Sequence, residues 1–125
     1  MSLQRIRKLV GTLLAVTAFS TAASAHHAWV WYGKSDFSLT GTIVETKFGN
    51  PHDRLVVKAA DGVLWNVVLS PPRRSERAGL VEKEIHVGDT VTAYGERHQD
   101  PERMEMKAER LKIGDRTYDL YPERL

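Results

Sequence analysis

The order of strand-like and helix-like segments predicts an all-β fold with one short helix. Three strand-like runs come first, a short helix follows, and two or three further strands complete the chain. Asp61-Gly62 is the strongest turn signal and marks a hairpin between the second and third runs. This element order predicts a small OB-like Greek-key barrel of five to six strands, whose binding loops follow the first and fourth strands. A plain antiparallel β-sandwich is the alternative.

The pattern of apolar residues defines the first three strands. Apolar side chains alternate along residues 37–43 and again along residues 55–59. Gly41 lies inside the first run, where a glycine indicates a bend or a close backbone approach. Residues 63–69 are apolar on both faces apart from Asn66, so we expect this third strand to lie centrally in the sheet.

A helix is predicted over residues 71–78. Ser70 is a good N-cap, Pro71 suits the first turn, and Gly79 fits just past the end. Three further strand-like runs follow, at residues 90–94, 104–113 and 117–120.

Residues 1–25 are typical of a cleavable signal peptide, so we expect the working molecule to begin at His26 in the periplasm. A short basic start, an apolar run over residues 9–19 and the small residues Ala23-Ser24-Ala25 form its three parts. The apolar run is shorter than the ~20 residues that a membrane-spanning helix needs. We therefore expect no stable membrane anchor after cleavage.

Cleavage changes the charge balance of the chain. The removed segment holds three basic residues and no acidic one, so the formal net charge falls from +2 to −1. A nucleic-acid partner usually requires a basic face, and we expect none here. The chain contains no cysteine and therefore no disulfide. We expect residues 26–34 to form an aromatic and histidine-rich leader, and residues 35–125 to form one OB-like domain that is monomeric.

Five short motifs occur in a set order along the chain: Ala25-His26-His27, Phe37-x-Leu39-x-Gly41-x-Ile43, Asn50-Pro51-His52, Trp65 and Gly88-Asp89-x-Val91. Together they resemble a family of short bacterial proteins that carry a signal peptide and one small OB-like domain. The resemblance implies this fold and export, and it implies no particular reaction. Related chains often have a glycine-rich turn where residues 97–103 stand here, and this stretch is charged and lacks glycine.

The mature N-terminus is a candidate metal site. Cleavage after Ala25 would give His26 a free α-amine, which can chelate a metal ion together with the histidine's own imidazole. His27 and His52 supply further imidazoles, and such nitrogen ligands suit copper first, then zinc or nickel. The ligand set, though not the fold, resembles the N-terminal histidine sites of copper-dependent polysaccharide oxidases and periplasmic copper carriers. Two solvated histidines at a flexible terminus are the alternative.

His98 is a fourth candidate metal ligand. It lies in the loop between the fourth and fifth strands, and we expect the OB arrangement to place that loop at the same end as the loop of His52. Asp53 and Asp100 are candidate acceptors that would orient an imidazole ring. The alternatives are backbone capping for His52 and an exposed loop position for His98.

Trp29 and Trp31 of the leader are candidate stacking surfaces for a sugar or another flat ligand, with Asn50 and Asp53 supplying polar contacts. We favour packing of the leader aromatics on the barrel, because a short leader needs anchoring to be ordered.

Enzyme signatures are missing from the sequence. There is no nucleophile elbow, no His-Glu-x-x-His, no phosphate loop and no dinucleotide fingerprint. We therefore expect a periplasmic binding protein, with a copper site at the histidines as the leading hypothesis. The runner-up is a metal-free module that holds a partner protein or small ligand through the barrel loops. A copper-dependent redox enzyme is a third, less favoured hypothesis.

Overall fold

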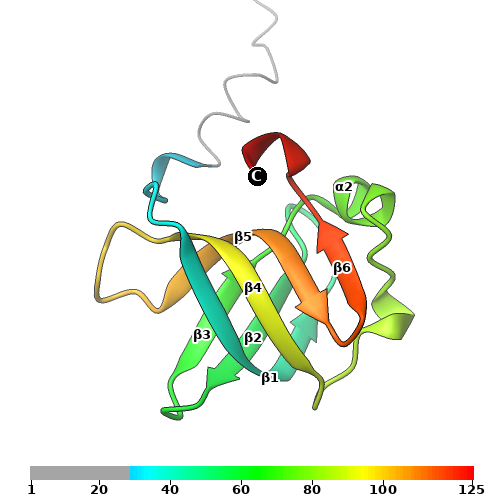
Figure 1. Ribbon diagram of the computed structural model, residues 1–125, viewed down its shortest axis with the longest axis horizontal. Coiled ribbons are helices and arrows are strands. Elements are labelled where there is room, and N and C mark those ends of the chain that lie inside the picture. The colour runs from blue at the N-terminus through cyan, green and yellow to red at the C-terminus, as the bar shows by residue number, and fades with distance from the viewer. Residues whose placement is uncertain (1–28) are drawn as a thin grey trace, which may run out of the picture.

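The computed structural model describes residues 29–125 and shows a small β-barrel with one short helix beside it (Figure 1). The all-β, OB-like prediction is confirmed. The strands are β1 (Phe37–Lys47), β2 (Arg54–Ala59), β3 (Leu64–Val68), β4 (Thr90–Arg97), β5 (Glu105–Ile113) and β6 (Arg116–Asp119). Helix α2 (Pro72–Arg77) and the 3-10 turn η1 (Glu82–Glu84) connect β3 to β4, and η2 (Pro122–Arg124) ends the chain. The predicted signal peptide, His26 and His27 lie outside the described residues.

The sheet order is β3-β2-β1-β4-β5-β6, and all neighbouring strands in this order are antiparallel. A parallel pairing of β3 with β5 closes the first five strands into a barrel, and β6 adds to the edge of β5. The third strand is paired on both sides, as its apolar sequence predicts. The helix between β3 and β4 completes the element order of an OB fold.

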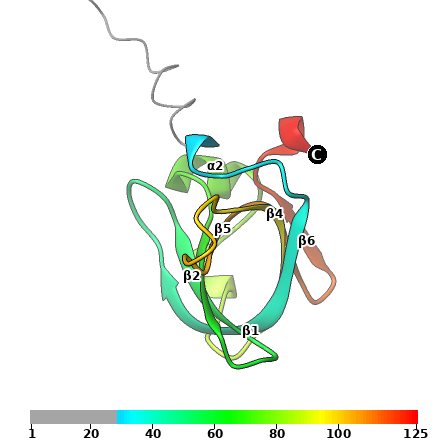
Figure 2. The same cartoon turned by 90° about the vertical axis from the view of Figure 1, so that its left-hand side faces the viewer.

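Strand β1 serves both halves of the barrel. Its residues 37–42 pair with β4, and its residues 41–47 pair with β2 across a bulge that follows Ile43. Figure 2 shows β1 as one strongly curved strand that follows the barrel wall. Gly41 lies where the two pairings overlap, and a Cβ atom there would collide with the carbonyl oxygen of Lys58. The close backbone approach predicted for this glycine is confirmed.

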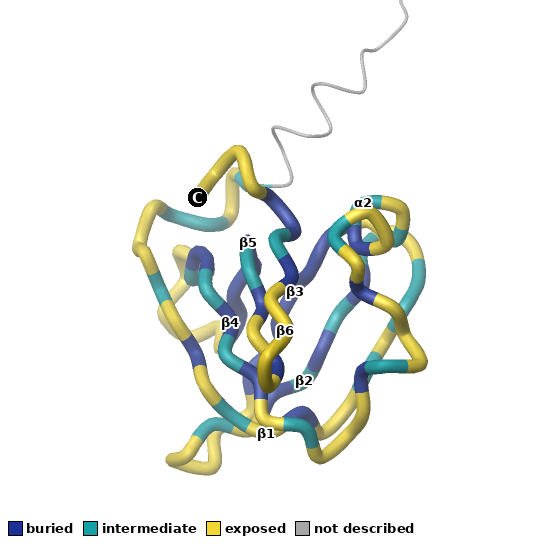
Figure 3. Tube along the Cα trace, turned by 45° about the vertical axis from the view of Figure 1, so that its right-hand side comes forward, coloured by how far each residue is buried: buried dark blue, intermediate teal, exposed yellow. Residues whose placement is uncertain are grey.

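One apolar core fills the barrel. Its fully buried members include Ile43, Leu55, Val57, Val67, Leu69, Val91, Met106 and Leu111. Strand β5 is buried on both faces over Glu105–Glu109 (Figure 3). The inner face meets this core, and residues of the leader and of the C-terminal segment contact the outer face. Polar residues on the outer face of a strand are usually exposed to solvent. The burial of Glu105, Lys107 and Glu109 therefore makes this strand a candidate for a functional site.

Helix α2 lies where predicted, but its predicted cap is wrong. The N-cap is Pro71, and no side chain caps the helix. The hydroxyl of Ser70 instead lies 2.7 Å from that of Ser75, and both residues are buried. Each buried hydroxyl thus has the other as its hydrogen-bond partner, so Ser70 does not cap the helix. No helix within residues 29–125 is long and apolar enough to cross a membrane.

Candidate binding site

A buried lysine lies on the outer face of β5. Lys107 stands between the core residues Met106 and Ala108, so its side chain points away from the core. It is 1% exposed, and its Nζ lies 4.8 Å from the centre of the Trp29 ring and 5.6 Å from that of Tyr121. Lys107 forms no ion pair with Asp or Glu anywhere in residues 29–125. The ammonium is therefore enclosed by aromatic rings rather than by carboxylates.

The charged neighbours of Lys107 are mainly basic. Its Nζ lies 3.4 Å from Nε2 of His52, and the charges of Arg54, Arg74 and Arg124 act on it. We call these five residues the basic cluster. They come from the β1–β2 loop, β2, α2, β5 and η2, so only the folded chain brings them together.

Two arginines of the basic cluster already have carboxylate partners. Arg74 pairs with Glu123 and Arg124 pairs with Glu109, each at 2.9 Å. Arg54 forms no ion pair within the described part of the chain. The basic cluster therefore keeps uncompensated positive charge at Lys107 and Arg54.

The pKa values of the basic cluster reflect this positive field. Burial, together with the charges of Arg124, Arg54 and Arg74, lowers the pKa of Lys107 from 10.5 to about 8. Burial, together with Lys107 and Arg54, lowers the pKa of His52 from 6.5 to about 4. At pH 7 the imidazole is therefore neutral and Lys107 is still mainly charged. A nearby anion would oppose both shifts, because it favours the protonated form of each group.

Trp29 packs the leader against the basic cluster. The Arg124 guanidinium lies 3.8 Å from the centre of the Trp29 ring, and Tyr121 meets the ring edge-on at 4.9 Å. With Lys107 nearby, Trp29 has two cationic neighbours, an arrangement that stabilises both through cation–π attraction. Trp31, two residues later, is 63% exposed. The leader thus packs through one of its two predicted aromatic candidates and presents the other to solvent.

A second polar cluster surrounds Glu105 on the same face of β5. Its carboxylate accepts hydrogen bonds from the Tyr32 hydroxyl and from Nδ2 of Asn66, both at 2.8 Å. Nε2 of His98 lies 3.9 Å from this carboxylate, and Nδ1 of His98 accepts the backbone N–H of Asp100 at 3.0 Å. Burial and the bond to Glu105 raise the pKa of Tyr32 above its ordinary value. The Glu105 carboxylate thus has partners in the folded chain, among them Arg103 at 3.5 Å, whereas the Lys107 ammonium has no carboxylate partner within residues 29–125.

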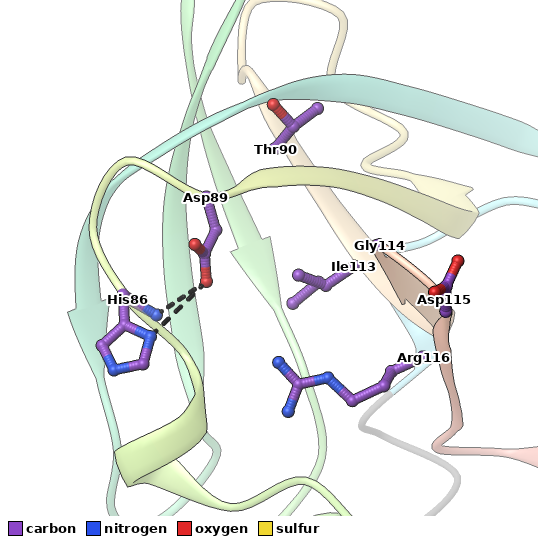
Figure 4. Close-up of a pocket in the computed structure, with 7 residues that line it drawn as sticks. All are labelled: His86, Asp89, Thr90, Ile113, Gly114, Asp115 and Arg116. Atoms are coloured by element: carbon purple, nitrogen blue, oxygen red, sulfur yellow. Dashed lines mark hydrogen bonds and ion pairs between the residues drawn. The ribbon is translucent and has the colours of Figure 1, made fainter.

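A separate hollow of about 550 Å³ lies at the turn between β5 and β6 (Figure 4). Asp89 accepts the backbone N–H of His86 at 3.0 Å, and the His86 ring lies 3.8 Å from the same carboxylate. Arg116 pairs with Glu84 at 2.9 Å. These charged groups have partners in the folded chain, so the hollow is a weaker candidate than the basic cluster.

Residues 14–107 match the model of a family of unknown function, DUF6152. The chain belongs to the DUF6152 family. The family description states no activity, so membership leaves the function open. Comparison with curated proteins finds no match to this DUF6152 chain.

Comparison with solved structures finds chains that are similar to the DUF6152 chain. A chain of the S. pombe Stn1-Ten1 complex matches with a TM-score of 0.52 and 15% identity, over 63% of this chain and 57% of that chain. A ZRD-deleted mutant of TiaS in complex with agmatine matches with a TM-score of 0.48 and 14% identity, over 66% of this chain and 25% of that one. The DUF6152 chain thus spans just over half of the first neighbour. At these identities the likeness shows the fold alone.

The structure brings the described histidine candidates to one face of β5 and keeps them in two clusters. His52 contacts Lys107, His98 approaches Glu105, and these two β5 residues are two positions apart on one face. The two imidazoles share no hydrogen-bond partner in the described part of the chain. Within residues 29–125 no group of three or more His, Cys, Asp or Glu is arranged to hold a metal ion.

The remaining predicted contacts lie on loops. Oδ1 of Asp53 accepts the backbone N–H of Gly49 at 2.9 Å, and Oδ1 of Asp100 accepts that of Glu102 at 3.0 Å. Among the hydrogen bonds of residues 29–125, neither carboxylate holds an imidazole, so both aspartates stabilise their own loops. Asn50, three residues before Asp53, is exposed.

Sequence reasoning missed Lys107. The pattern Glu105-x-Lys107-x-Glu109 is typical of the solvent-facing side of a strand. The only signal in the sequence is indirect. The aromatic leader needs a surface on which to pack, and a lysine can form part of such a surface through cation–π contact.

Proposed function

We propose that this DUF6152 protein is exported and acts as a small binding module that holds an anionic group at the basic cluster. The observation that carries the proposal is the buried Lys107 ammonium, which has no carboxylate partner within residues 29–125. Burial of an unpaired charge is costly, and a ligand anion would offset that cost. His52 lies in the loop after β1, which is one of the two loops that OB folds use for binding.

The edge of the basic cluster is open to a ligand. His52 and Arg54 are half-buried and Arg124 is exposed, whereas Lys107 is buried. A carboxylate or phosphate placed against the arginines gains charge-assisted hydrogen bonds from the guanidinium groups. The ammonium adds electrostatic attraction, which is strong because the site is partly shielded from water.

Export sets where this binding takes place. The signal-type sequence of residues 1–25 supports a periplasmic location after cleavage that follows Ala25. In this proposal the mature protein begins at His26, three residues before the tryptophan that packs on the basic cluster.

A transition-metal site at the mature N-terminus is the second candidate, with copper first. The feature in its favour is the sequence itself, in which cleavage after Ala25 would give His26 a free α-amine next to the imidazole of His27. The contact between His52 and Lys107 disfavours His52 as a ligand in the described arrangement, because the ammonium nitrogen lies 3.4 Å from Nε2 of the imidazole. A charged ammonium can only donate, so it competes with a metal ion for the lone pair of that nitrogen. The metal proposal therefore rests on His26 and His27.

Nuclear magnetic resonance can test the anion proposal directly. Mature protein, residues 26–125, is titrated at pH 7 and low ionic strength with inorganic phosphate and, separately, with acetate. We expect saturable shifts at His52, Arg54 and the Trp29 indole for at least one of the two anions. Lys107→Met should abolish them, and Lys112→Met, an exposed lysine of the same strand, should not. Equal responses of wild type and Lys107→Met would contradict the proposal.

Copper(II) titration of the same protein tests the second candidate. Loss of tight binding in His26→Ala with no change in His52→Ala would indicate a terminal chelate. Loss in both variants would show that His52 leaves Lys107 to join the metal. Binding no tighter than that of a free His-His peptide would exclude a specific copper site and, with it, a copper-dependent redox role.

A further inference from the structure

A groove lies between the β1–β2 loop and α2. Its volume is about 530 Å³, within the range of roughly 300–1,000 Å³ that is typical of small-molecule sites. Apolar residues form much of its lining: Phe48, Pro72, Leu80 and Val81. Leu80 belongs to the core and Phe48 packs against it, so these walls are held in place by the barrel itself. None of the five residues of the basic cluster lines the groove.

The charged residues of the groove are all acidic. Glu76 of α2 and Glu82 of η1 are exposed beside the apolar walls, and Asp53 is a buried third carboxylate. No Lys, Arg or His belongs to the lining. Neither Glu76 nor Glu82 forms an ion pair within residues 29–125, whereas Glu84, two residues after Glu82, pairs with Arg116. The groove thus combines an apolar surface with uncompensated negative charge.

We infer that this groove binds an organic cation, a compact molecule with an amine or amidine head and an aromatic or aliphatic body. The body would pack on Phe48 and Leu80, where removal of apolar surface from water supplies most of the affinity. The head would lie between the carboxylates of Glu76 and Glu82. Because each exposed ion pair contributes little on its own, the apolar body is as necessary as the charge. The site goes beyond the proposed function, since it uses other residues and selects the opposite charge.

Three probes of nearly equal size and different charge test this inference on the mature protein: benzamidinium, the neutral benzamide and the anionic benzoate. In a titration followed by amide signals, benzamidinium should shift Gly49, Val81 and Glu82 saturably. Benzamide should bind about ninefold more weakly, because it lacks two surface ion pairs that contribute about threefold each. Benzoate should leave these signals unchanged. Equal affinity for benzamide and benzamidinium, or benzamidinium shifts confined to other residues, would overturn the inference.

Matched variants test whether Glu76 and Glu82, which we call the rim of the groove, select for a cation. Glu76→Gln and Glu82→Gln should each weaken benzamidinium binding about threefold, the value of one exposed ion pair. Glu102→Gln, an exposed glutamate of the β4–β5 loop, should have no effect. Unchanged binding in both rim variants would contradict the inference. Lys107→Met should bind benzamidinium as wild type does, so failure of the anion proposal would not affect this test.

Discussion

Replacement of Lys107 by methionine removes the buried charge and keeps most of the side-chain volume. The pKa of Lys107 falls from 10.5 to about 8, and each unit corresponds to about 1.4 kcal/mol between the two protonation states. The charged form is therefore destabilised in the folded protein by about 3 kcal/mol. Cation–π contacts with Trp29 and Tyr121 return about 1–2 kcal/mol of this. We expect Lys107→Met at pH 7 to be as stable as wild type, or up to about 2 kcal/mol more stable.

The difference between the two proteins should depend on pH in a defined direction. Between pH 8 and 10.5 the unfolded chain still holds the Lys107 proton that the folded chain has released, so wild-type stability rises with pH. The slope approaches about 1.4 kcal/mol per pH unit, and Lys107→Met lacks it. Burial raises the pKa of Tyr121 to about 12, so ionisation of this tyrosine in the unfolded chain opposes the rise above pH 10. The useful window is therefore pH 7 to 9.5.

Urea unfolding measured by tryptophan fluorescence gives both the stability difference at pH 7 and its dependence on pH. The free energy of unfolding is compared for wild type, Lys107→Met and the exposed control Lys112→Met across this window. Wild type should gain stability relative to Lys107→Met as pH rises, and Lys112→Met should follow wild type. If the difference in free energy of unfolding between wild type and Lys107→Met stays constant with pH, the pKa of Lys107 is not lowered by folding. A loss above about 2 kcal/mol in Lys107→Met at pH 7 would also contradict the expectation, because the ammonium would then act as a net stabilising contact.

Three further outcomes are expected. His52 should titrate at about pH 4 in an imidazole NMR experiment, and because its unfolded pKa is 6.5, stability should fall as pH drops from 6.5 toward 4; a measured pKa of 6.5 would contradict this. Gly95→Ala should lose about 3 kcal/mol or more, since its Cβ would collide with the carbonyl oxygen of Lys107, whereas Gly33→Ala has free space and should be nearly neutral; equal urea midpoints would contradict the close approach. Mass spectrometry of exported protein should find His26 as the first residue, and intact precursor outside the cytoplasm would argue against cleavage.

Local patterns were sufficient to predict most of the fold. The apolar alternation of β1 and β2, the Asp61-Gly62 hairpin and the doubly apolar β3 all depend on neighbouring residues, and these features agree with the structure. Strand β4 extends beyond its predicted end, to Arg97, because pairing with β5 continues through polar residues. The predicted cap of α2 is wrong because the hydroxyl of Ser70 pairs with that of Ser75 inside the helix rather than with the free backbone N–H groups of the first turn.

The candidate site was harder to predict, since its chemistry depends on contacts between distant segments. Lys107 looks solvent-facing in sequence and becomes buried only because Trp29 and Tyr121 cover it. His52 was identified as a candidate ligand from its loop position, but its state depends on an ammonium from β5. Residue type and loop position therefore identify His52, at one edge of the site. Tertiary packing determines the burial of Lys107 and the protonation state of His52.

Calorimetric titration of mature protein with inorganic phosphate tests most directly whether the basic cluster holds an anion. We expect one site per chain, weaker binding at high salt, and at least a tenfold loss of affinity, about 1.4 kcal/mol, in Lys107→Met but not in Lys112→Met. Absence of binding to wild type in low salt, or the same affinity in Lys107→Met, would contradict it.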